Sequence, residues 1–279
     1  MKKRIFFFDI DGTLYSENKK NILSQTKKLI LTLSKKPNTI LSIATGRNYR
    51  NLNVLEELFP LFKYFVLCNG AITIENKSSF KQNQYKLIDK NPISSKHIQY
   101  LFEQIIDNDF NIIPYNIGFN KEAFFSNGNS KNLKFIEEWR KNHWQNGIEI
   151  EDSQIDNTFH FNNEVYTIYM FGDDRLKINL KNTEEKNIFN IYNWKNHMDL
   201  TVKNINKFHG IQKIKNKFND YEVVCMGDGC NDEEMLQYSD LSIAMGNSKY
   251  QYIKEMSDLV TPHVDENKIY DFFEQHHLI

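Results

Sequence analysis

Short apolar runs alternate with longer amphipathic segments at both ends of the chain. Residues 4–8 form an apolar, aromatic run of strand length, and residues 39–44 form a second one. Between them, residues 24–35 carry leucine and isoleucine at helical spacing among lysines, with Ser24 placed to cap the helix. A run as hydrophobic as residues 4–8 is typical of a central parallel strand that is buried on both faces. The pattern therefore predicts a strand, a helix and a second strand.

The alternation continues after these elements and returns near the carboxyl terminus. A helix is expected over 48–59, ended by Pro60, and a strand over 64–68. Alternating strands and helices imply right-handed crossovers and a parallel sheet with helices on both sides, so the expected fold class is α/β. The later part of the chain predicts strands over 222–226, 241–245 and 259–261, and helices over 206–218, 232–238, 250–256 and 268–276.

The middle of the chain has a different pattern, with longer gaps and scattered aromatic residues. This pattern is typical of an inserted α+β domain with an antiparallel sheet. We expect residues 1–76 and 194–279 to build the core, and residues 77–193 to form the inserted domain, which acts as a lid. The inserted domain carries two short alternating stretches and two helical segments, at 123–125, 165–171, 96–108 and 129–143.

Composition excludes several classes of protein. The 279 residues are 40% hydrophobic and 25% charged, which is ordinary for a globular protein, and the net charge of −1 indicates neither a nucleic-acid nor a membrane partner. Acids interrupt the apolar run after the amino terminus, so it does not form a signal peptide, and no run approaches the roughly 20 residues of a membrane span. Three cysteines without a Cys-x-x-Cys pair indicate neither a disulfide framework nor a zinc site. A cytoplasmic enzyme of undetermined oligomeric state is expected.

Two acids, Asp9 and Asp11, follow the first strand. Ligands of open α/β sheets bind beyond the carboxyl ends of the strands, where these carboxylates would repel each other unless a cation lies between them or one keeps its proton. A bound Mg²⁺ is the simplest remedy. A calcium loop is excluded, because it requires glycine where Leu14 stands and an acid where Lys20 stands. A turn of solvated acids fits the motif alone equally well.

Further polar residues lie at later strand ends and at one helix start: Thr45, Gly46 and Arg47; Lys207; and Asp228, Asn231 and Asp232. Residues of these types suit phosphoryl transfer, in which a carboxylate attacks phosphorus and Mg²⁺ neutralises the phosphate oxygens. The expected roles are Asp9 as metal-bound nucleophile and Asp11 as general acid and base. We also count Asp11 among the residues of the metal site. Its side chain is nevertheless expected not to bind the ion.

The remaining residues complete the expected site. Asp228 is the first choice as a further metal ligand, and Asp232 binds the ion either directly or through water. Thr45 and the Gly46 amide can donate to phosphoryl oxygens, although such a pair taken alone is more often only a turn. Lys207 would balance the negative charge. Arg47 either contacts substrate or pairs with a surface acid.

Taken together, the motifs resemble those of the haloacid dehalogenase superfamily, in the same order. The further stretches Asn69-Gly70-Ala71 and Ala244-Met245-Gly246-Asn247 are similar to the Cof-type subfamily, whose large cap lies between the second and third motifs. The likeness covers both core segments, whereas the cap is matched by size and position only. The motifs are Phe8-Asp9-Ile10-Asp11-Gly12-Thr13-Leu14, Ala44-Thr45-Gly46-Arg47, Lys207 and Gly227-Asp228-Gly229-Cys230-Asn231-Asp232.

The resemblance implies a Mg²⁺-dependent phosphatase with a Rossmann-like core and a C2B-type cap. It assigns the same roles to Asp9, Asp11, Thr45, Lys207 and Asp228, and gives supporting roles to Asn231 at the phosphate and to Asp232 at the metal. One departure lies at Asp265-Glu266-Asn267-Lys268, where the family usually has a glycine. It affects the local turn and leaves catalysis untouched.

The expected activity is hydrolysis of small phosphorylated metabolites through an aspartyl-phosphate, with sugar phosphates first and cofactor-pathway phosphates next. Two alternatives remain at this point. A sugar phosphomutase uses similar motifs but returns the phosphoryl group to another hydroxyl. A non-catalytic sensor of phosphorylated metabolites would be expected to lack Asp9 or Asp11, and this chain has both.

Overall fold

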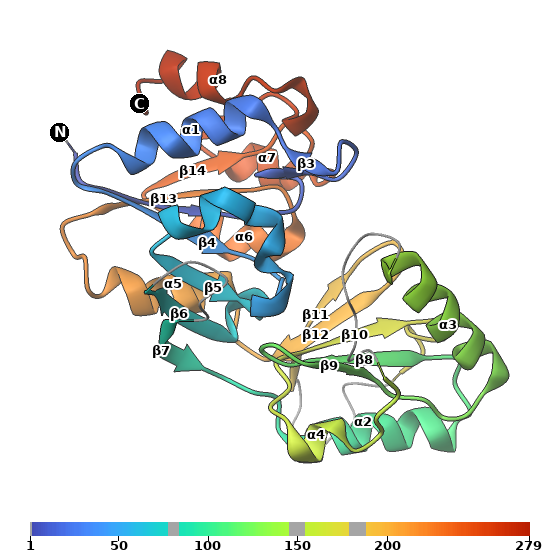
Figure 1. The fold of residues 1–279 in the computed structure, drawn as a ribbon. Helices are drawn as coiled ribbons and strands as arrows, with labels where there is room; N and C mark the ends of the chain where they lie inside the picture. Colours follow the sequence, from blue (N-terminus) through green and yellow to red (C-terminus); the bar gives the residue numbers. More distant parts are fainter. Residues whose placement is uncertain (1, 78–83, 145–153, 179–187) are drawn as a thin grey trace. The chain divides into compact units, whose positions relative to one another are not determined.

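The chain folds into two compact units in the computed structural model, which describes residues 2–77, 84–144, 154–178 and 188–279. Residues 1–90 and 205–279 form the first unit, and residues 91–204 form the second (Figure 1). The first unit holds a mostly parallel sheet, and the second holds an antiparallel one. The expected α/β fold with an inserted antiparallel domain is therefore confirmed.

An eight-stranded sheet forms the centre of the first unit, in the order β15-β14-β13-β1-β4-β5-β6-β7. The strands from β15 to β5 run parallel, while β6 and β7 are antiparallel additions at one edge. The sequence pattern did not predict this antiparallel edge. The strands are β1 (Arg4–Phe8), β4 (Thr39–Ala44), β5 (Tyr64–Leu67), β6 (Ile72–Asn76), β7 (Tyr85–Lys90), β13 (Glu222–Gly227), β14 (Leu241–Ala244) and β15 (Leu259–Val260), and a separate small hairpin joins β2 (Tyr15–Ser16) and β3 (Asn21–Ile22).

Strand β1 lies in the middle of this sheet and is buried on both faces. Its side chains alternate, so Ile5 and Phe7 join the hydrophobic cluster on one face. Phe6 lies on the other face, where its ring packs against Phe273 with centroids 6.3 Å apart. Each buried side chain of this size contributes about 1.5–3 kcal/mol to folding. Burial on both faces of the sheet therefore requires every position of this run to be apolar. The strand ends at Phe8, which places Asp9 at the carboxyl edge of the sheet.

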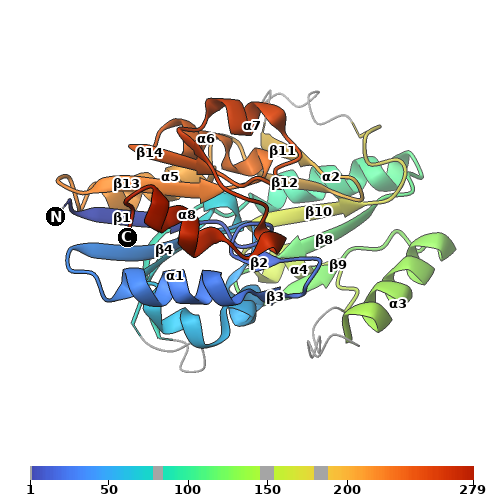
Figure 2. The ribbon, with the colours of Figure 1, turned by 90° about the horizontal axis from the view of Figure 1, so that it is seen from above.

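Helices cover both faces of the sheet (Figure 2). Residues of α5, α6 and α7 share the cluster that contains Ile5 and Phe7, whereas α1 and α8 pack together on the opposite face. The helices are α1 (Ser24–Ser34), α5 (Lys207–Lys215), α6 (Glu233–Gln237), α7 (Gln251–Met256) and α8 (Ile269–Gln275), with the short 3₁₀ turns η2 (Cys68–Gly70), η4 (Cys230–Asp232) and η5 (Val264–Glu266).

Side-chain hydrogen bonds join the amino terminus of α1 to the start of α8 and the turn before it. Ser24 does not cap α1 as expected, because it is the first residue of the helix and the side chain of Asn267 accepts the Gln25 N–H instead, at 2.9 Å. In return, Gln25 Oε1 accepts the N–H of Tyr270 at 3.1 Å. Asn267 adopts a left-handed conformation with φ 55°, which asparagine tolerates better than most residues. Asparagine therefore adopts the left-handed turn in the stretch where the family that the chain resembles usually has a glycine.

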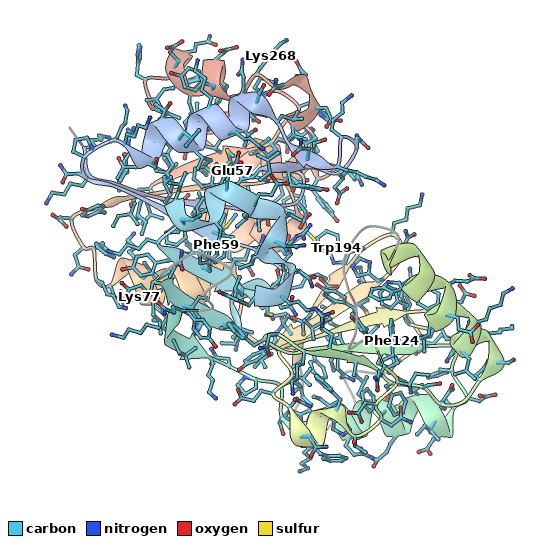
Figure 3. The ribbon with its side chains drawn as sticks, in the orientation of Figure 1. Glu57, Phe59, Lys77, Phe124, Trp194 and Lys268 are labelled. Atoms are coloured by element: carbon cyan, nitrogen blue, oxygen red, sulfur yellow. The ribbon has the colours of Figure 1, made fainter. Side chains whose placement is uncertain are left out.

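The segment expected to be an α-helix over 48–59 is a kinked 3₁₀ helix, η1 (Tyr49–Leu61). Glu56 interrupts it with φ 46°, and Pro60 lies inside the element rather than after it. Apolar side chains hold this irregular segment against the sheet, since the ring of Phe59 stacks on Phe65 with centroids 4.7 Å apart. Glu57, on the same segment, is exposed (Figure 3). Periodicity located this segment but could not distinguish the helix type.

The boundaries of the two units differ from those expected. The first unit continues to residue 90 rather than 76, because β7 (Tyr85–Lys90) hydrogen-bonds to β6 in the core sheet. The second unit continues to residue 204 rather than 193, because β12 (Met198–Val202) pairs with β10 in the inserted sheet. Strand pairing, which is a tertiary contact, sets both boundaries.

The second unit is a five-stranded antiparallel sheet in the order β11-β12-β10-β8-β9. Apolar residues of α2, including Leu101 and Phe102, pack on Ile168 and Leu200 of the sheet. Within the described residues of both units, no helix combines the length and apolar character that crossing a bilayer requires. The elements are β8 (Ile113–Ile117), β9 (Glu122–Phe124), β10 (Thr167–Phe171), β11 (Phe189–Asn193), β12 (Met198–Val202), α2 (Ser95–Asp107), α3 (Ser130–Trp144) and α4 (Phe159–Asn162).

Candidate active site

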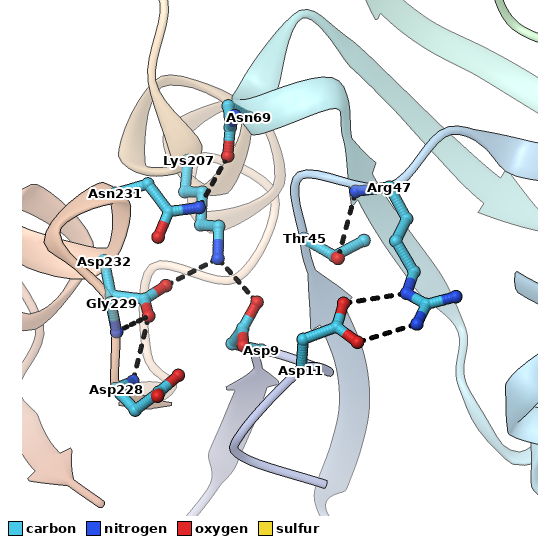
Figure 4. Close-up of polar contacts among 10 residues, drawn as sticks. All are labelled: Asp9, Asp11, Thr45, Arg47, Asn69, Lys207, Asp228, Gly229, Asn231 and Asp232. Atoms are coloured by element: carbon cyan, nitrogen blue, oxygen red, sulfur yellow. Dashed lines mark hydrogen bonds and ion pairs between the residues drawn. The ribbon is translucent and has the colours of Figure 1, made fainter. Parts of the chain in front are cut away.

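Three carboxylates converge at the carboxyl ends of neighbouring strands β1 and β13. Asp9 follows β1, Asp228 follows β13, and Asp232 ends the turn η4. The parallel register places Phe8 opposite Met226, so Asp9 and Asp228 emerge at the same edge of the sheet. Ligand oxygens of the three side chains lie within 4.8 Å of one another (Figure 4). The tertiary structure thus brings together acids that are far apart in the sequence.

Lys207 supplies the positive charge of this cluster. It is the first residue of α5, a helix whose amino terminus is capped by Asn206, and its side chain is fully buried. The ammonium group donates to Asp9 Oδ1 and to Asp232 Oδ1, both at 2.6 Å (Figure 4). Lys207 is therefore an internal partner of the acids rather than a solvated helix residue.

The electrostatics of the cluster favour a further cation. Burial, with the nearby carboxylates of Asp9 and Asp232, raises the pKa of Asp228 to about 8. Burial also raises the pKa of Asp9 to about 7, although the Lys207 ammonium group opposes the shift. Burial alone would lower the pKa of Lys207, but Asp232 and Asp9 outweigh it and raise that pKa. One lysine does not neutralise three acids, so the donor set fits a hard divalent cation such as Mg²⁺.

Asp232 also shapes the loop that carries Asp228. Its Oδ2 accepts the backbone N–H groups of Asp228 at 3.0 Å and of Gly229 at 2.9 Å, while Oδ1 accepts from Lys207. A carboxylate with these three donors is held firmly in one orientation. Asp232 therefore fixes the positions of the loop and of the lysine, besides lying in the acid cluster.

Asp11 is turned away from the acid cluster and toward Arg47. The guanidinium donates from Nη2 to Asp11 Oδ1 at 2.6 Å and from Nε to Oδ2 at 2.8 Å, a bidentate pair. Arg47 is itself anchored by donation from Nη1 to the Asn51 carbonyl at 2.9 Å. Asp11 was counted with the metal-binding residues, but its side chain is not among the clustered acids of the described chain. Arg47 therefore pairs with an acid, as one of its two expected roles proposed, but that acid is Asp11 of the candidate site.

The turn after β4 holds the expected phosphate-binding pair. Thr45 is buried, and its hydroxyl oxygen accepts the Arg47 N–H at 3.2 Å. The next strand-end turn is bonded to this one, because Asn69 N–H donates to the Thr45 carbonyl at 3.0 Å. The turn that carries Thr45 is thus held in place, and Thr45 lies beside the acids (Figure 4).

Asn69 lies near the site, and the sequence assigned it no role. Its Oδ1 accepts a hydrogen bond from Asn231 Nδ2 at 2.8 Å. Asn69 and the preceding Cys68 both have left-handed backbones, with φ 52° and 50°. Such conformations cost of order 1 kcal/mol or more for residues other than glycine, and they cluster at functional sites. The Asn-Gly pair was the signal available in the sequence.

Asn247 is another such residue. Its Nδ2 donates to the Gly12 carbonyl at 2.8 Å and to Asp228 Oδ2 at 3.3 Å, while its Oδ1 accepts the Val264 N–H at 2.9 Å. Asn247 therefore joins three strand-end loops and orients the Asp228 carboxylate. Gly12 is required at its position, since a Cβ there would lie 2.5 Å from an oxygen of Asp228.

Gly70 allows the site's loops to pack closely, and its replacement by Ala should destabilise the protein. Gly70 has φ 96°, and a Cβ would lie 1.8 Å from the Asn206 carbonyl oxygen. We expect Gly70→Ala to lower the free energy of unfolding by about 3 kcal/mol or more, measured by denaturant unfolding. Gly128→Ala is the control, because Gly128 also has a positive φ of 81° but no atom within 4 Å of its added Cβ. The control should lose only about 1–2 kcal/mol; equal losses would exclude the clash as the cause.

Comparison with known protein families gives one match over most of the chain. A family model described as haloacid dehalogenase-like hydrolase matches residues 6–273. The match spans both segments of the first unit and the whole of the second. It therefore covers every residue of the candidate site.

Individual relatives agree with this match. YkrA of Bacillus subtilis, named as a candidate phosphatase, is 27% identical over 278 residues, covering 96% of each chain. The B. subtilis protein YcsE, named 5-amino-6-(5-phospho-D-ribitylamino)uracil phosphatase, is 23% identical, covering 92% of this chain and 89% of its own. Among solved structures, the HAD subclass IIB sugar phosphatase BT4131 superposes with a TM-score of 0.78 at 22% identity, covering 99% and 100% of the two chains. The structural likeness shows a shared fold.

Proposed function

Since the chain belongs to the family of haloacid dehalogenase-like hydrolases, we propose that it is a Mg²⁺-dependent phosphomonoesterase that works through an aspartyl-phosphate on Asp9. One observation carries the proposal. The Asp9 carboxylate lies with Asp228 and Asp232 in one cluster and contacts the buried Lys207 ammonium group at 2.6 Å. This arrangement combines a nucleophile, acids for a cation and a fixed positive charge for a phosphoryl group.

In the first half of the reaction, an Asp9 carboxylate oxygen forms a bond to phosphorus as the bond from phosphorus to the ester oxygen breaks. Asp11 in its protonated form gives its proton to the leaving oxygen. Lys207 and donors from Thr45 and the Gly46 amide stabilise negative charge on the phosphoryl oxygens. Asp9, Asp228 and Asp232 would hold Mg²⁺, which when bound supplies shielding of the phosphate charge.

In the second half, Asp11 takes a proton from a water molecule whose oxygen attacks phosphorus. The bond between phosphorus and Asp9 breaks, which releases inorganic phosphate and restores the carboxylate. The bidentate contact with Arg47 holds the Asp11 carboxylate in one place as it accepts the proton of the water molecule. Arg47 therefore acts as a positioning residue in this proposal.

The proposed substrates are small phosphorylated metabolites, with sugar phosphates first and cofactor-pathway phosphates such as flavin precursors or pyridoxal phosphate next. The names of two similar proteins fall in these two substrate classes, since one is named for a ribitylaminouracil phosphate and another as a sugar phosphatase. The expected cytoplasmic location belongs to the same proposal. A screen of phosphorylated metabolites, with and without Mg²⁺ and with detection of free phosphate, tests it.

The screen separates the proposal from its rivals. We expect Mg²⁺-dependent release of phosphate from at least one of these metabolites. Conversion of a sugar phosphate to its isomer without phosphate release would identify a phosphomutase instead. Binding of phosphorylated metabolites with no turnover of any kind would contradict the enzymatic proposal and favour a sensor.

Replacing Asp228 with Ala should weaken Mg²⁺ binding. The loss of one carboxylate ligand is expected to raise the Mg²⁺ dissociation constant at least about 100-fold, because even neighbours of ligands contribute 10–100-fold. Calorimetric titration of Mg²⁺ measures the change directly, and the Mg²⁺ dependence of phosphate release should move with it. Asp220→Ala is the control, since Asp220 is an exposed partner of Lys3. An unchanged Mg²⁺ titration for Asp228→Ala would remove this residue from the ligand set.

A further inference from the structure

We propose that Asn69 is a positioning residue that sets the orientation of the Asn231 amide for phosphoryl binding. The inference rests on the proposed function and on the phosphate-binding role that the family resemblance implies for Asn231. Asn69 Oδ1 accepts a hydrogen bond from Asn231 Nδ2 at 2.8 Å, and both side chains are buried (Figure 4). A side-chain carbonyl oxygen accepts hydrogen bonds and cannot donate them. In this contact the Asn231 NH₂ group donates one hydrogen to Asn69 and keeps its second hydrogen for a ligand.

Asn69 also connects the two loops on which phosphate binding depends. Its backbone N–H donates to the Thr45 carbonyl at 3.0 Å, and the N–H of Cys68 donates to the Arg47 carbonyl at 3.0 Å. A Cβ placed on Gly46 would lie 3.3 Å from Asn69 Oδ1. The Asn69 side chain thus spans the space from the Thr45–Arg47 turn to the loop of Asn231. A shift of this side chain would alter the distance between the two groups of phosphate donors.

Asn69 combines two energetically unfavourable features. Cys68 and Asn69 are consecutive residues with positive φ, which side chains rarely adopt. Asn69 Nδ2 is buried without a hydrogen-bond partner in the described part of the chain, so Asn231 is the one partner of this side chain there. Strained backbones cluster at functional sites, and a buried polar group without a partner calls for an explanation. In this conformation, the Oδ1 atom of Asn69 is the acceptor for the Asn231 NH₂ group.

The experiment compares the binding of inorganic phosphate by Asn69→Gly, Asn231→Ala and the double variant, each as the Mg²⁺-loaded full chain. Glycine adopts φ 52° without strain, so the melting temperature of Asn69→Gly should stay close to that of the wild type. We expect Asn69→Gly to raise the phosphate dissociation constant about tenfold, because a donor to a charged ligand is misplaced. In the Asn231→Ala background, the same substitution should change the constant less than about twofold, because the residue acts through Asn231.

Asn267→Gly is the matched control for this experiment. Asn267 also has a left-handed backbone, with φ 55°, and its side chain makes two hydrogen bonds to the start of α1. The control should leave phosphate affinity within about twofold of the wild type, whatever its effect on stability. An equal loss of phosphate affinity in the control would show that general loosening of loops is the cause, and would overturn the inference.

Two further outcomes would also overturn it. The inference fails if Asn69→Gly binds phosphate like the wild type, or if it loses the same tenfold in the Asn231→Ala background. Both outcomes leave the proposed function intact, since wild-type protein would still bind phosphate and release it from metabolites. Failure of the wild type in both assays would instead refute the proposed function, and the inference would fall with it.

Discussion

Asp9→Asn is expected to abolish phosphate release while the protein stays folded. Asparagine has nearly the shape of aspartate but its amide does not attack phosphorus, so the aspartyl-phosphate route is closed. Removal of one member of a catalytic unit commonly costs about 10⁴-fold or more in kcat. Steady-state phosphate release at saturating Mg²⁺ measures the loss, with the best substrate from the metabolite screen.

The stability of this variant is the internal control. Asp9 is buried in a cluster that raises its pKa to about 7, so the ionised carboxylate is poorly accommodated, and a neutral side chain should be tolerated. Lys207 keeps its second partner, Asp232, at 2.6 Å. We therefore expect unfolding close to that of the wild type. A variant that is folded and retains a rate near that of the wild type would remove Asp9 from the role of nucleophile.

Lys207→Met is expected to have the largest effect on stability. Methionine fills a similar volume without charge, so the change leaves the Asp9 and Asp232 carboxylates buried without their shared cation. Breaking a buried ion pair from one side typically costs about 3–5 kcal/mol. Denaturant unfolding without divalent cations measures the loss. Added Mg²⁺ should restore part of it, because a cation that binds only the folded state stabilises that state.

Lys213→Met tests whether any lysine of α5 would behave in this way. Lys213 lies on the same helix, but its side chain is 42% exposed and its ammonium group lies 3.8 Å from Asp89 Oδ1. Exposed pairs of this kind contribute about 0–1 kcal/mol. If Lys207→Met lowers the free energy of unfolding by less than about 1 kcal/mol, as the control does, Lys207 does not neutralise the acid cluster.

The positions of the catalytic candidates followed from local sequence patterns. The run Phe6-Phe7-Phe8 predicted a strand buried on both faces, and the acids after it were expected at the carboxyl edge of a parallel sheet, where they are found. Glycine and asparagine marked the turns, and helical periodicity marked α1, α2 and α3 to within one or two residues. These predictions depend on the spacing of neighbouring residues, which the sequence displays directly.

Side-chain partners did not follow from such patterns. The bidentate contact of Arg47 with Asp11, the acceptor that Asn69 offers to Asn231, and the capping of α1 by Asn267 each join segments from different parts of the chain. Spacing says nothing about which polar groups meet, because each choice depends on through-space distances of a few ångströms. The kink at Glu56 likewise depends on packing rather than on periodicity.

The sequence by itself determined the α/β class, the order of the elements and the set of polar residues at the strand ends. Only the tertiary structure decided that Lys207 lies 2.6 Å from Asp9, 198 positions away, that Asp11 faces Arg47, and that β7 extends the core sheet. The physical reason is that strand and helix formation respond to local periodicity and turn chemistry, whereas ion pairs and edge strands depend on burial and on which surfaces the folded chain brings together.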